Sequence, residues 1–191
     1  MAATRLLVET HNEDAVSIRA IADAVGVSPP SIYLHFPDKE TLVFAVCERQ
    51  FESLDAFLEA EAALATDPVD ELARRGAAYV RFGVEHPEAY RIMFMGRSTN
   101  VDRQIDTVEK AGTTAFDHHV AAVQRALDAG ALRDDVDARQ AAIFLWTGVH
   151  GITSLLISLS AFPWGDTEAL VAGMCSLQLH ALTADRTSAS S

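Results

Sequence analysis

Residues 17–36 carry the side chains whose types and spacing best suit chemistry with a partner. The stretch SIRAIADAVGVSPPSIYLHF sets hydroxyl, phenol and imidazole groups among regularly spaced apolar residues. Ser31, Leu34 and His35 fall outside the apolar spacing, so we expect them to point outward. A short helix with small and polar outward residues is what a DNA major groove admits. The segment therefore favours non-covalent recognition over catalysis.

Two short helices must position these side chains, joined by the turn Gly26-Val27-Ser28. Ser17 is a good N-cap for the first helix, Gly26 a good C-cap, and Ser28 with Pro29 opens the second. The residues expected to pack the pair together are Ile18, Ile21, Ala22 and Val25 on the first helix and Val27, Ile32 and Phe36 on the second. This is the geometry of a DNA-binding helix-turn-helix, although any connector between two helices could share it.

The rest of the sequence offers no catalytic constellation, since its acids are scattered and it has neither a Gly-rich phosphate loop nor a Cys-x-x-Cys motif. His118 and His119 are adjacent and diverge by about 100° on a helix, so they cannot chelate one metal together. Asp117 beside them lacks the i, i+4 spacing of helical metal ligands. We expect no enzyme, no metal site and no cofactor, with one of these histidines exposed and the other packed.

Every long segment has helical periodicity and none alternates apolar with polar residues, which predicts an all-α protein of about nine helices. Proline, glycine and aspartate mark the breaks between them. The expected helices are a short one around Leu6–Val8, the pair in residues 17–36, and helices over 39–61, 68–86, 87–95, 101–129, 137–161 and 166–184.

The composition narrows the class of protein. With 191 residues and 49% hydrophobic content, the chain suits one full domain or a small domain attached to a medium one. Two distant cysteines and no secretory signal at the N-terminus predict a cytoplasmic location. A net charge of −12 disfavours non-specific coating of nucleic acid, but it leaves room for one small DNA-reading surface.

Residues 140–165 carry no formal charge and are long enough to cross a bilayer. Interspersed hydroxyl groups, two glycines and the absence of flanking basic or aromatic belts favour a buried helix or a subunit interface instead. We therefore expect no membrane contact and a homodimer built from this stretch and the last helix. The residues expected at the interface are Gly148, Gly151, Ile152, Leu155, Leu159, Leu170, Met174 and Leu177.

The string VSIRAIADAVGVSPPSIYLHFPDKETL (residues 16–42) resembles the N-terminal DNA-binding domain of the TetR family of bacterial transcriptional regulators. The resemblance rests on the Gly-Val-Ser turn, Ile32-Tyr33, His35-Phe36 and the spacing of Lys39 and Leu42. Two further strings, HPEAYRIMFMG (residues 86–96) and WTGVHG (residues 146–151), resemble a WHG-like type of C-terminal domain in that family.

The resemblance implies a helix-turn-helix domain over residues 1–48 and a helical effector-binding and dimerisation domain over 49–184. The Ser/Thr-rich composition of residues 185–191 predicts a disordered tail. The resemblance further implies a ligand-responsive regulator, most commonly a repressor, that binds a pseudo-palindromic double-stranded operator as a homodimer. A small apolar effector would release it from DNA.

Site residues follow from the same resemblance. The positions that match DNA contacts are Ser17, Arg19, Ser28, Pro30, Ser31, Tyr33, Leu34, His35 and Lys39. The aromatic, methionine and histidine side chains expected to line an effector pocket are Phe82, Tyr90, Met93, Phe94, Phe116, His119, Phe144, Trp146 and His150. Each pocket residue could equally be ordinary core.

A second hypothesis is a small-molecule sensor that binds DNA weakly or not at all. Its motivation is the charge of the first 50 residues, which hold four cations against seven acids, and the lack of a basic arm before the first expected helix. Either the start codon is misassigned or the arm is absent. Few cations limit the number of phosphates that each half-site can neutralise. A helical enzyme is a third and weaker hypothesis, because catalytic side chains do not cluster.

Overall fold

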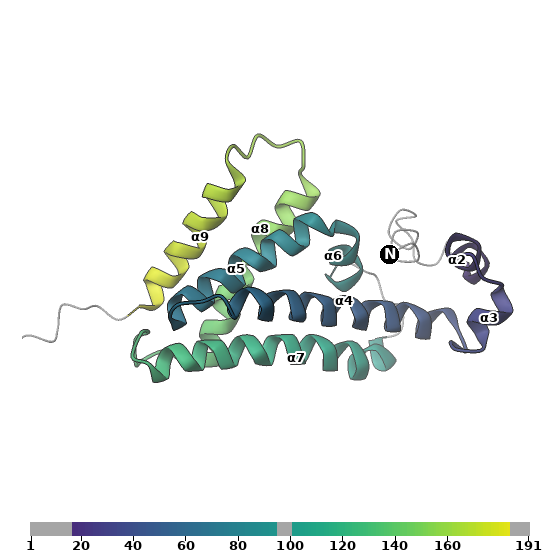
Figure 1. Ribbon diagram of the computed structural model, residues 1–191, viewed down its shortest axis with the longest axis horizontal. Coiled ribbons are helices and arrows are strands. Elements are labelled where there is room, and N and C mark those ends of the chain that lie inside the picture. The colour runs from purple at the N-terminus through teal and green to yellow at the C-terminus, as the bar shows by residue number, and fades with distance from the viewer. Residues whose placement is uncertain (1–16, 95–100, 184–191) are drawn as a thin grey trace, which may run out of the picture. The chain divides into compact units, whose positions relative to one another are not determined.

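The computed structural model describes residues 17–94 and 101–183, with side chains from residue 112 onward in the second range. Eight helices lie within this described part, so the all-α prediction is confirmed (Figure 1). They are α2 (Ile18–Val25), α3 (Pro29–Tyr33), α4 (Lys39–Ala62), α5 (Pro68–Glu85), α6 (Pro87–Phe94), α7 (Val101–Asp128), α8 (Ala138–Ser158) and α9 (Thr167–Leu182). The helix expected around Leu6–Val8 and the tail over 185–191 lie outside the described residues.

The chain divides into two compact units. One comprises residues 1–53 and 86–113, and the other comprises residues 54–85 and 114–191. The division falls inside α4 and α7, so both long helices contribute to each unit. The predicted functional boundary after residue 48 is a separate matter and stays a prediction.

Local capping explains where α2 and α3 begin and end. The Ser17 hydroxyl accepts a hydrogen bond from the Ala20 amide at 3.1 Å, and Gly26 closes α2 at φ 76°, a conformation that glycine adopts without strain. The Ser28 hydroxyl accepts from the Ser31 amide at 3.4 Å. Proline at the first two positions of α3 removes amides that have no partner inside a helix.

The two short helices pack on each other through fewer residues than expected. Ile18, Ile21, Ala22 and Ile32 are buried, as predicted, and Phe36 is half-buried. The predicted packing of Val25 and Val27 is wrong, because these side chains are 43% and 44% exposed. Val25 is the last residue of α2 and Val27 lies in the turn, so both stand beyond the packed part of the stripe.

In the second unit α5 packs against α8 and α9, and α8 packs against α9. Its core combines leucines from α5, α8 and α9 with small residues of α7 and α8, namely Ala122, Val123, Ala126, Ala141 and Ala142. The four alanines are at most 2% exposed, which places them fully inside this core. The connection between α7 and α8 is joined to the end of α9 where Leu132 forms an isolated antiparallel β-bridge with Thr183.

Within the described residues, α8 is the one helix long and apolar enough to cross a membrane, but only a third of its most apolar stretch is buried. The helix α8 packs against α5 and α9, so part of its apolar surface lies in the core of this unit. A Cβ at Gly148 would overlap the side-chain amide of Gln178, whose Nε2 donates to the Phe144 carbonyl at 2.7 Å. Gly148 therefore admits a contact between α8 and α9 of one chain.

A buried guanidinium joins three helices of this unit. Arg75 on α5 is 3% exposed and donates to Glu71 at 3.0 Å and to Glu59 of α4 at 2.8 Å. Glu71 also accepts two hydrogen bonds from Arg125 of α7. Burial alone would raise the pKa of Glu71, but the hydrogen bonds from Arg125 and Arg75 outweigh burial and lower it.

Replacing Arg75 by methionine should lower the free energy of unfolding by about 2–3 kcal/mol. The loss falls short of the roughly 3–5 kcal/mol of a fully buried pair because Arg125 still faces Glu71 and Glu59 reaches water. The adjacent Arg74 pairs with Asp70 at 2.9 Å near the surface, so Arg74→Met should cost less than about 1 kcal/mol. Urea unfolding of both variants at one protein concentration provides the measurement. Equal losses would contradict the assigned role of Arg75.

Candidate nucleic-acid interface and aromatic cluster

Most side chains on and directly after the short helix α3 are exposed, and Ser28 caps its N-terminus. Ser31, Tyr33, Leu34 and His35 are all exposed, with Tyr33 at 55% and Leu34 at 84%. Pro30 at the second position of α3 is exposed as well. The prediction that Ser31, Leu34 and His35 point outward is therefore confirmed, and the Tyr33 ring is exposed beside them. A phenol, an imidazole and a leucine side chain offer polar and apolar contacts side by side.

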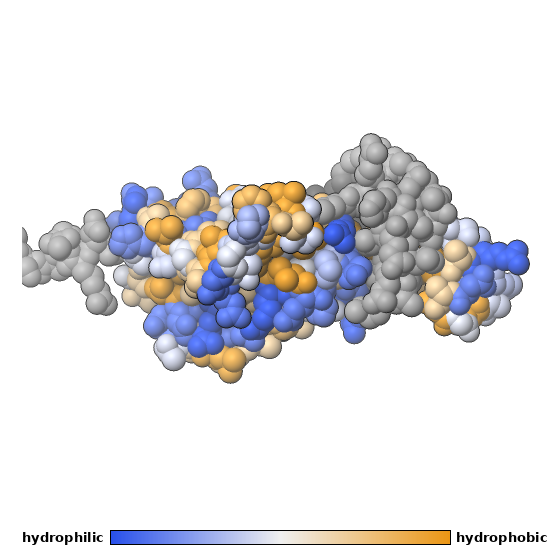
Figure 2. Space-filling view, turned by 90° about the horizontal axis from the view of Figure 1, so that it is seen from above, coloured by the Kyte–Doolittle hydropathy of each residue, from blue (hydrophilic) through white to orange (hydrophobic). Residues whose placement is uncertain are grey.

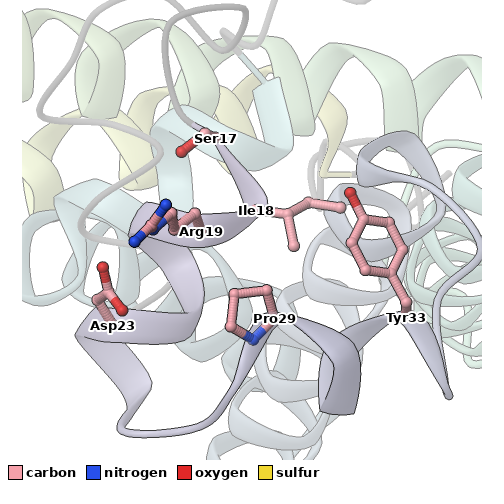
Figure 3. A pocket seen from close by; sticks show the side chains of 6 residues that line it. All are labelled: Ser17, Ile18, Arg19, Asp23, Pro29 and Tyr33. Carbon is pink, nitrogen blue, oxygen red and sulfur yellow. The ribbon is translucent and has the colours of Figure 1, made fainter.

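A groove of about 470 Å³ lies between α2 and α3 (Figure 3). Its lining comprises Ser17, Ile18, Arg19, Asp23, Pro29 and Tyr33. Ile18 points toward the Tyr33 ring, while Arg19 and Asp23 lie together on the opposite side (Figure 3). Two predicted contact residues of α2 and one of α3 thus share one surface. Sequence reasoning did not single out Asp23, whose carboxylate lines the same groove.

Three predicted hydroxyl contacts already have hydrogen-bond partners within the chain. Ser17 caps α2, and the Ser28 and Ser31 hydroxyls lie 2.8 Å apart with either able to donate. A hydroxyl has one hydrogen and two lone pairs, so each retains capacity for one more partner. Ser17 and Ser28 fix the two helix starts, which makes Arg19, Tyr33 and Leu34 the more independent contact groups.

Lys39 is the first residue of α4 and is half-buried. Beside it, the Asp38 carboxylate accepts hydrogen bonds from the Thr41 amide at 2.8 Å and from the Thr41 hydroxyl at 2.7 Å. An acid of the chain itself therefore satisfies part of the N-terminus of α4. Lys39 remains a cation at this position.

The residues predicted for an effector pocket fall into separate groups, one in each compact unit. In the first unit Tyr90 and Met93 are buried, and the Phe94 ring packs on Tyr90 at 4.9 Å and on Phe51 at 5.4 Å between centroids. The Cys47 thiol of α4 donates to the Ile92 carbonyl at 3.7 Å. This contact holds α6 to the early turns of α4.

In the second unit Phe116, His119, Trp146 and His150 form an aromatic cluster between α7 and α8. Trp146 lies 5.9 Å from Phe116 and 5.5 Å from His150 between ring centroids, and Phe116 lies 6.4 Å from His119. Sequence reasoning missed Tyr79 of α5. Its hydroxyl accepts from Trp146 Nε1 at 3.2 Å and lies 2.9 Å from His150 Nδ1.

Two further pocket predictions are placed differently. Phe82 is 5% exposed and packs on Phe57 of α4, over which the Arg81 guanidinium lies. The prediction that Phe144 lines an internal pocket is wrong, because its ring is 44% exposed. Its neighbours in α8 explain this outcome, since Leu145 and Ala142 take the inward positions of that turn.

Buried polar atoms accompany the aromatic cluster. Among the described residues, Arg75 Nη1 and His119 Nε2 are buried atoms with no hydrogen-bond partner. Burial, and after it the positive charge of Arg75, lower the pKa of His119 from 6.5 to about 4. Burial also lowers the pKa of His150. His119 is therefore neutral near pH 7.

The predicted interface residues form an apolar face on α8 and α9, with one exception. Leu155, Leu159, Leu170 and Leu177 are 38–73% exposed, Gly148, Gly151 and Met174 are half-buried, and Ile143 and Phe144 extend the face. Figure 2 shows apolar side chains at the surface of this unit beside polar ones. The prediction that Ile152 belongs to the face is wrong, because its side chain is 9% exposed and packs into the core.

Two family models match separate parts of the chain. A model described as "Bacterial regulatory proteins, tetR family" matches residues 1–46, and one described as "Tetracyclin repressor-like, C-terminal domain" matches residues 72–180. No curated protein is similar enough in sequence to match.

Solved structures share the fold over almost their full length. A protein of unknown function from Rhodococcus sp. RHA1 is 26% identical and covers 95% of this chain and 91% of its own, with a TM-score of 0.80. The transcriptional regulator PfmR from Thermus thermophilus is 22% identical, with coverages of 94% and 95% and a TM-score of 0.74. FadR from Bacillus subtilis, solved with stearoyl-CoA, is 14% identical, with coverages of 93% and 94% and a TM-score of 0.82.

The lowered pKa of His119 predicts a specific pH dependence of stability. The unfolded chain takes up a proton at this ring near pH 6.5 and the folded chain only near pH 4, so stability falls as pH drops between these values. Relative to His119→Gln, the parent should lose up to about 3 kcal/mol across that window, with no difference in slope above pH 7. The exposed His180 of α9 provides the control variant His180→Gln. Parallel stability curves for parent and His119→Gln down to pH 4 would refute the assignment.

Proposed function

The chain belongs to the TetR family of bacterial regulatory proteins, since a family model spans more than half of it, and we propose that it is a repressor released from its operator by a small apolar effector. Family membership makes it a DNA-binding regulator. The repressor role, the homodimer, the effector and a cytoplasmic location belong to the proposal, as does the absence of catalysis. The observation that carries it is the exposed helix α3, capped by Ser28 and held by the buried Ile32.

In this proposal α3 enters the major groove of DNA. Tyr33 and Leu34 face base edges, where an apolar group can contact a thymine methyl and a hydroxyl can bond to an edge or a phosphate. Arg19 lines the same groove as Tyr33 and contacts phosphate and a neighbouring base. Lys39, His35 and Ser17 contact the phosphate backbone of the DNA. Such contacts position the protein on the duplex but do not distinguish one base sequence from another. Pro30 and Ser31 complete the surface.

The two-fold symmetry of the operator follows from a homodimer formed by the apolar face of α8 and α9. Four leucines on this face are at least 38% exposed in the single chain, which is a larger apolar surface than isolated surface leucines make. Pairing the two helices across a two-fold axis covers it with a four-helix contact. The half-site centres would then lie about one helical turn apart, roughly 34–36 Å, or somewhat more.

In this proposal the effector site lies in the helical body, by which we mean the second unit, residues 54–85 and 114–191. The aromatic cluster around Trp146 supplies apolar walls, and Tyr79, His119 and His150 supply polar groups that can orient a ligand. In this proposal α6, which begins at Pro87 after α5 ends at Glu85, would transmit the binding of the effector to the DNA-binding helices. If the effector binds the DNA-free state more tightly than the DNA-bound state by roughly 1–3 kcal/mol, operator affinity falls 5–150-fold when the effector is bound. By reciprocity, operator must weaken effector binding by the same factor.

A second candidate function is a sensor with weak DNA binding. It has support from acidic residues of the head, by which we mean the predicted helix-turn-helix domain over residues 1–48. Asp23 lines the groove with Arg19, and Asp38 occupies the N-terminus of α4 beside Lys39. Carboxylates at these two positions repel the phosphates of DNA. Under this alternative the protein binds ligand but has no sequence-specific DNA affinity beyond that for unrelated duplex.

Lys39→Ala should weaken binding to operator and to unrelated duplex by a similar factor. The substitution should also reduce the slope of log K against log salt concentration by about 1 per subunit, because one phosphate contact is lost. Arg19→Ala should instead change base preference. The control is Arg49→Ala, which removes an exposed cation of α4 that pairs with Glu52. Electrophoretic and fluorescence-anisotropy titrations at matched salt give the measurement, and unchanged operator affinity in Lys39→Ala would reject the docking.

Gly151→Glu should convert the dimer to monomer while the chain stays folded. A Cβ at Gly151 meets nothing within 4 Å in the single chain, and glutamate is a better helix former than glycine, so the fold itself is not penalised. At a packed dimer contact the same change buries an unpaired charge. Ala121→Glu, on an exposed position of α7, is the matched control. Sedimentation of a folded, dimeric Gly151→Glu protein would disprove the assigned interface.

A further inference from the structure

Three metal-ligating side chains converge between α4 and α7, outside both sites described above. Asp55 and Glu59 lie one turn apart on α4, and His118 comes from α7. His118 Nδ1 lies 3.0 Å from both carboxylate oxygens of Asp55 and 3.7 Å from Glu59 Oε1. One donor atom from each residue falls within 4.8 Å of the others.

These separations suit donor atoms that share one cation. A Zn²⁺ ion holds nitrogen and oxygen ligands at roughly 2.0–2.2 Å, so neighbouring ligand atoms around it lie about 3.0–3.5 Å apart in tetrahedral or octahedral geometry. We propose that Asp55, Glu59 and His118 form a binding site for a divalent first-row transition cation such as Zn²⁺ or Co²⁺.

The donor set selects this class of ion. Imidazole nitrogen suits zinc, cobalt and nickel, whereas calcium and magnesium prefer oxygen ligands throughout. The Asp55 side chain is 18% exposed and those of Glu59 and His118 are 46% and 47% exposed, so water can complete the coordination. A net charge of −12 on the chain also favours the approach of cations.

Arg75 limits the affinity of the site. Its Nη2 donates to Glu59 Oε1 at 2.8 Å, and this is the same oxygen that lies 3.7 Å from His118 Nδ1, so the guanidinium and a bound cation would compete for it. The nearby guanidinium charge opposes a dication, which makes the site weaker than a structural zinc site.

The spacing of His118, His119 and Asp117 along one helix predicted no metal site, but the site proposed here takes its ligands from two helices. His118 and His119 do diverge, with His119 Nε2 buried inside the helical body and the His118 side chain half exposed. The missing i, i+4 partner comes from a different helix, as Asp55 and Glu59 of α4. A bound cation would cross-link α4, which begins at Lys39, to α7.

The test is a titration of the tag-free, metal-free full-length protein with Co²⁺ followed by its visible absorption, and with Zn²⁺ by calorimetry. The parent should bind one cation per chain and gain several degrees in Tm at saturation. His118→Gln and Asp55→Asn should each weaken binding at least tenfold. His180→Gln, which removes an exposed histidine of α9, should bind like the parent.

Urea unfolding without metal shows whether each variant is folded and how much the contact between His118 and Asp55 stabilises it. Saturable one-to-one binding that His118→Gln and Asp55→Asn both weaken supports the site. Two outcomes overturn it. One is cation affinity that is equal in parent and His118→Gln. The other is an ion pair only, in which His118→Gln loses stability but the parent shows no saturable one-to-one binding.

Discussion

The buried guanidinium of Arg75 is the interaction on which the helical body depends. It reaches Glu71 on its own helix and Glu59 on α4, and Glu71 in turn holds Arg125 of α7. A charge removed from water must keep its partners, so the three helices are fixed in one register. The same charge helps to keep His119 neutral. One residue thus takes part in both the packing of this unit and, after burial, the neutral state of His119.

The head depends on a different constraint, which is the small size of α3. A helix of five residues is not stable alone, because nucleation costs more than so few hydrogen bonds return. The Ser28 cap, the two prolines and the buried Ile32 hold it, so every other side chain is available to a partner. The strong exposure of Leu34 is a consequence of this arrangement.

Local signals predicted the fold well, because proline, glycine and capping side chains act within a few residues. Ser17, Gly26 and Asp137 all mark helix ends where the sequence placed them. Long-range choices were less predictable. The sequence could not show that Phe144 faces outward while Ile152 faces inward, since both fit an uncharged helix that is apolar on nearly every side. Nor could it place Tyr79 against Trp146, 67 residues away.

The central claim, that α3 reads a specific operator, is tested most directly by selection from a random pool of duplexes with the purified protein. The account predicts enrichment of a pseudo-palindrome whose half-site centres lie one helical turn or somewhat more apart, and its loss when an apolar effector is added. Recovery of unenriched, random sequence at moderate salt would contradict the account and favour a sensor that does not read DNA.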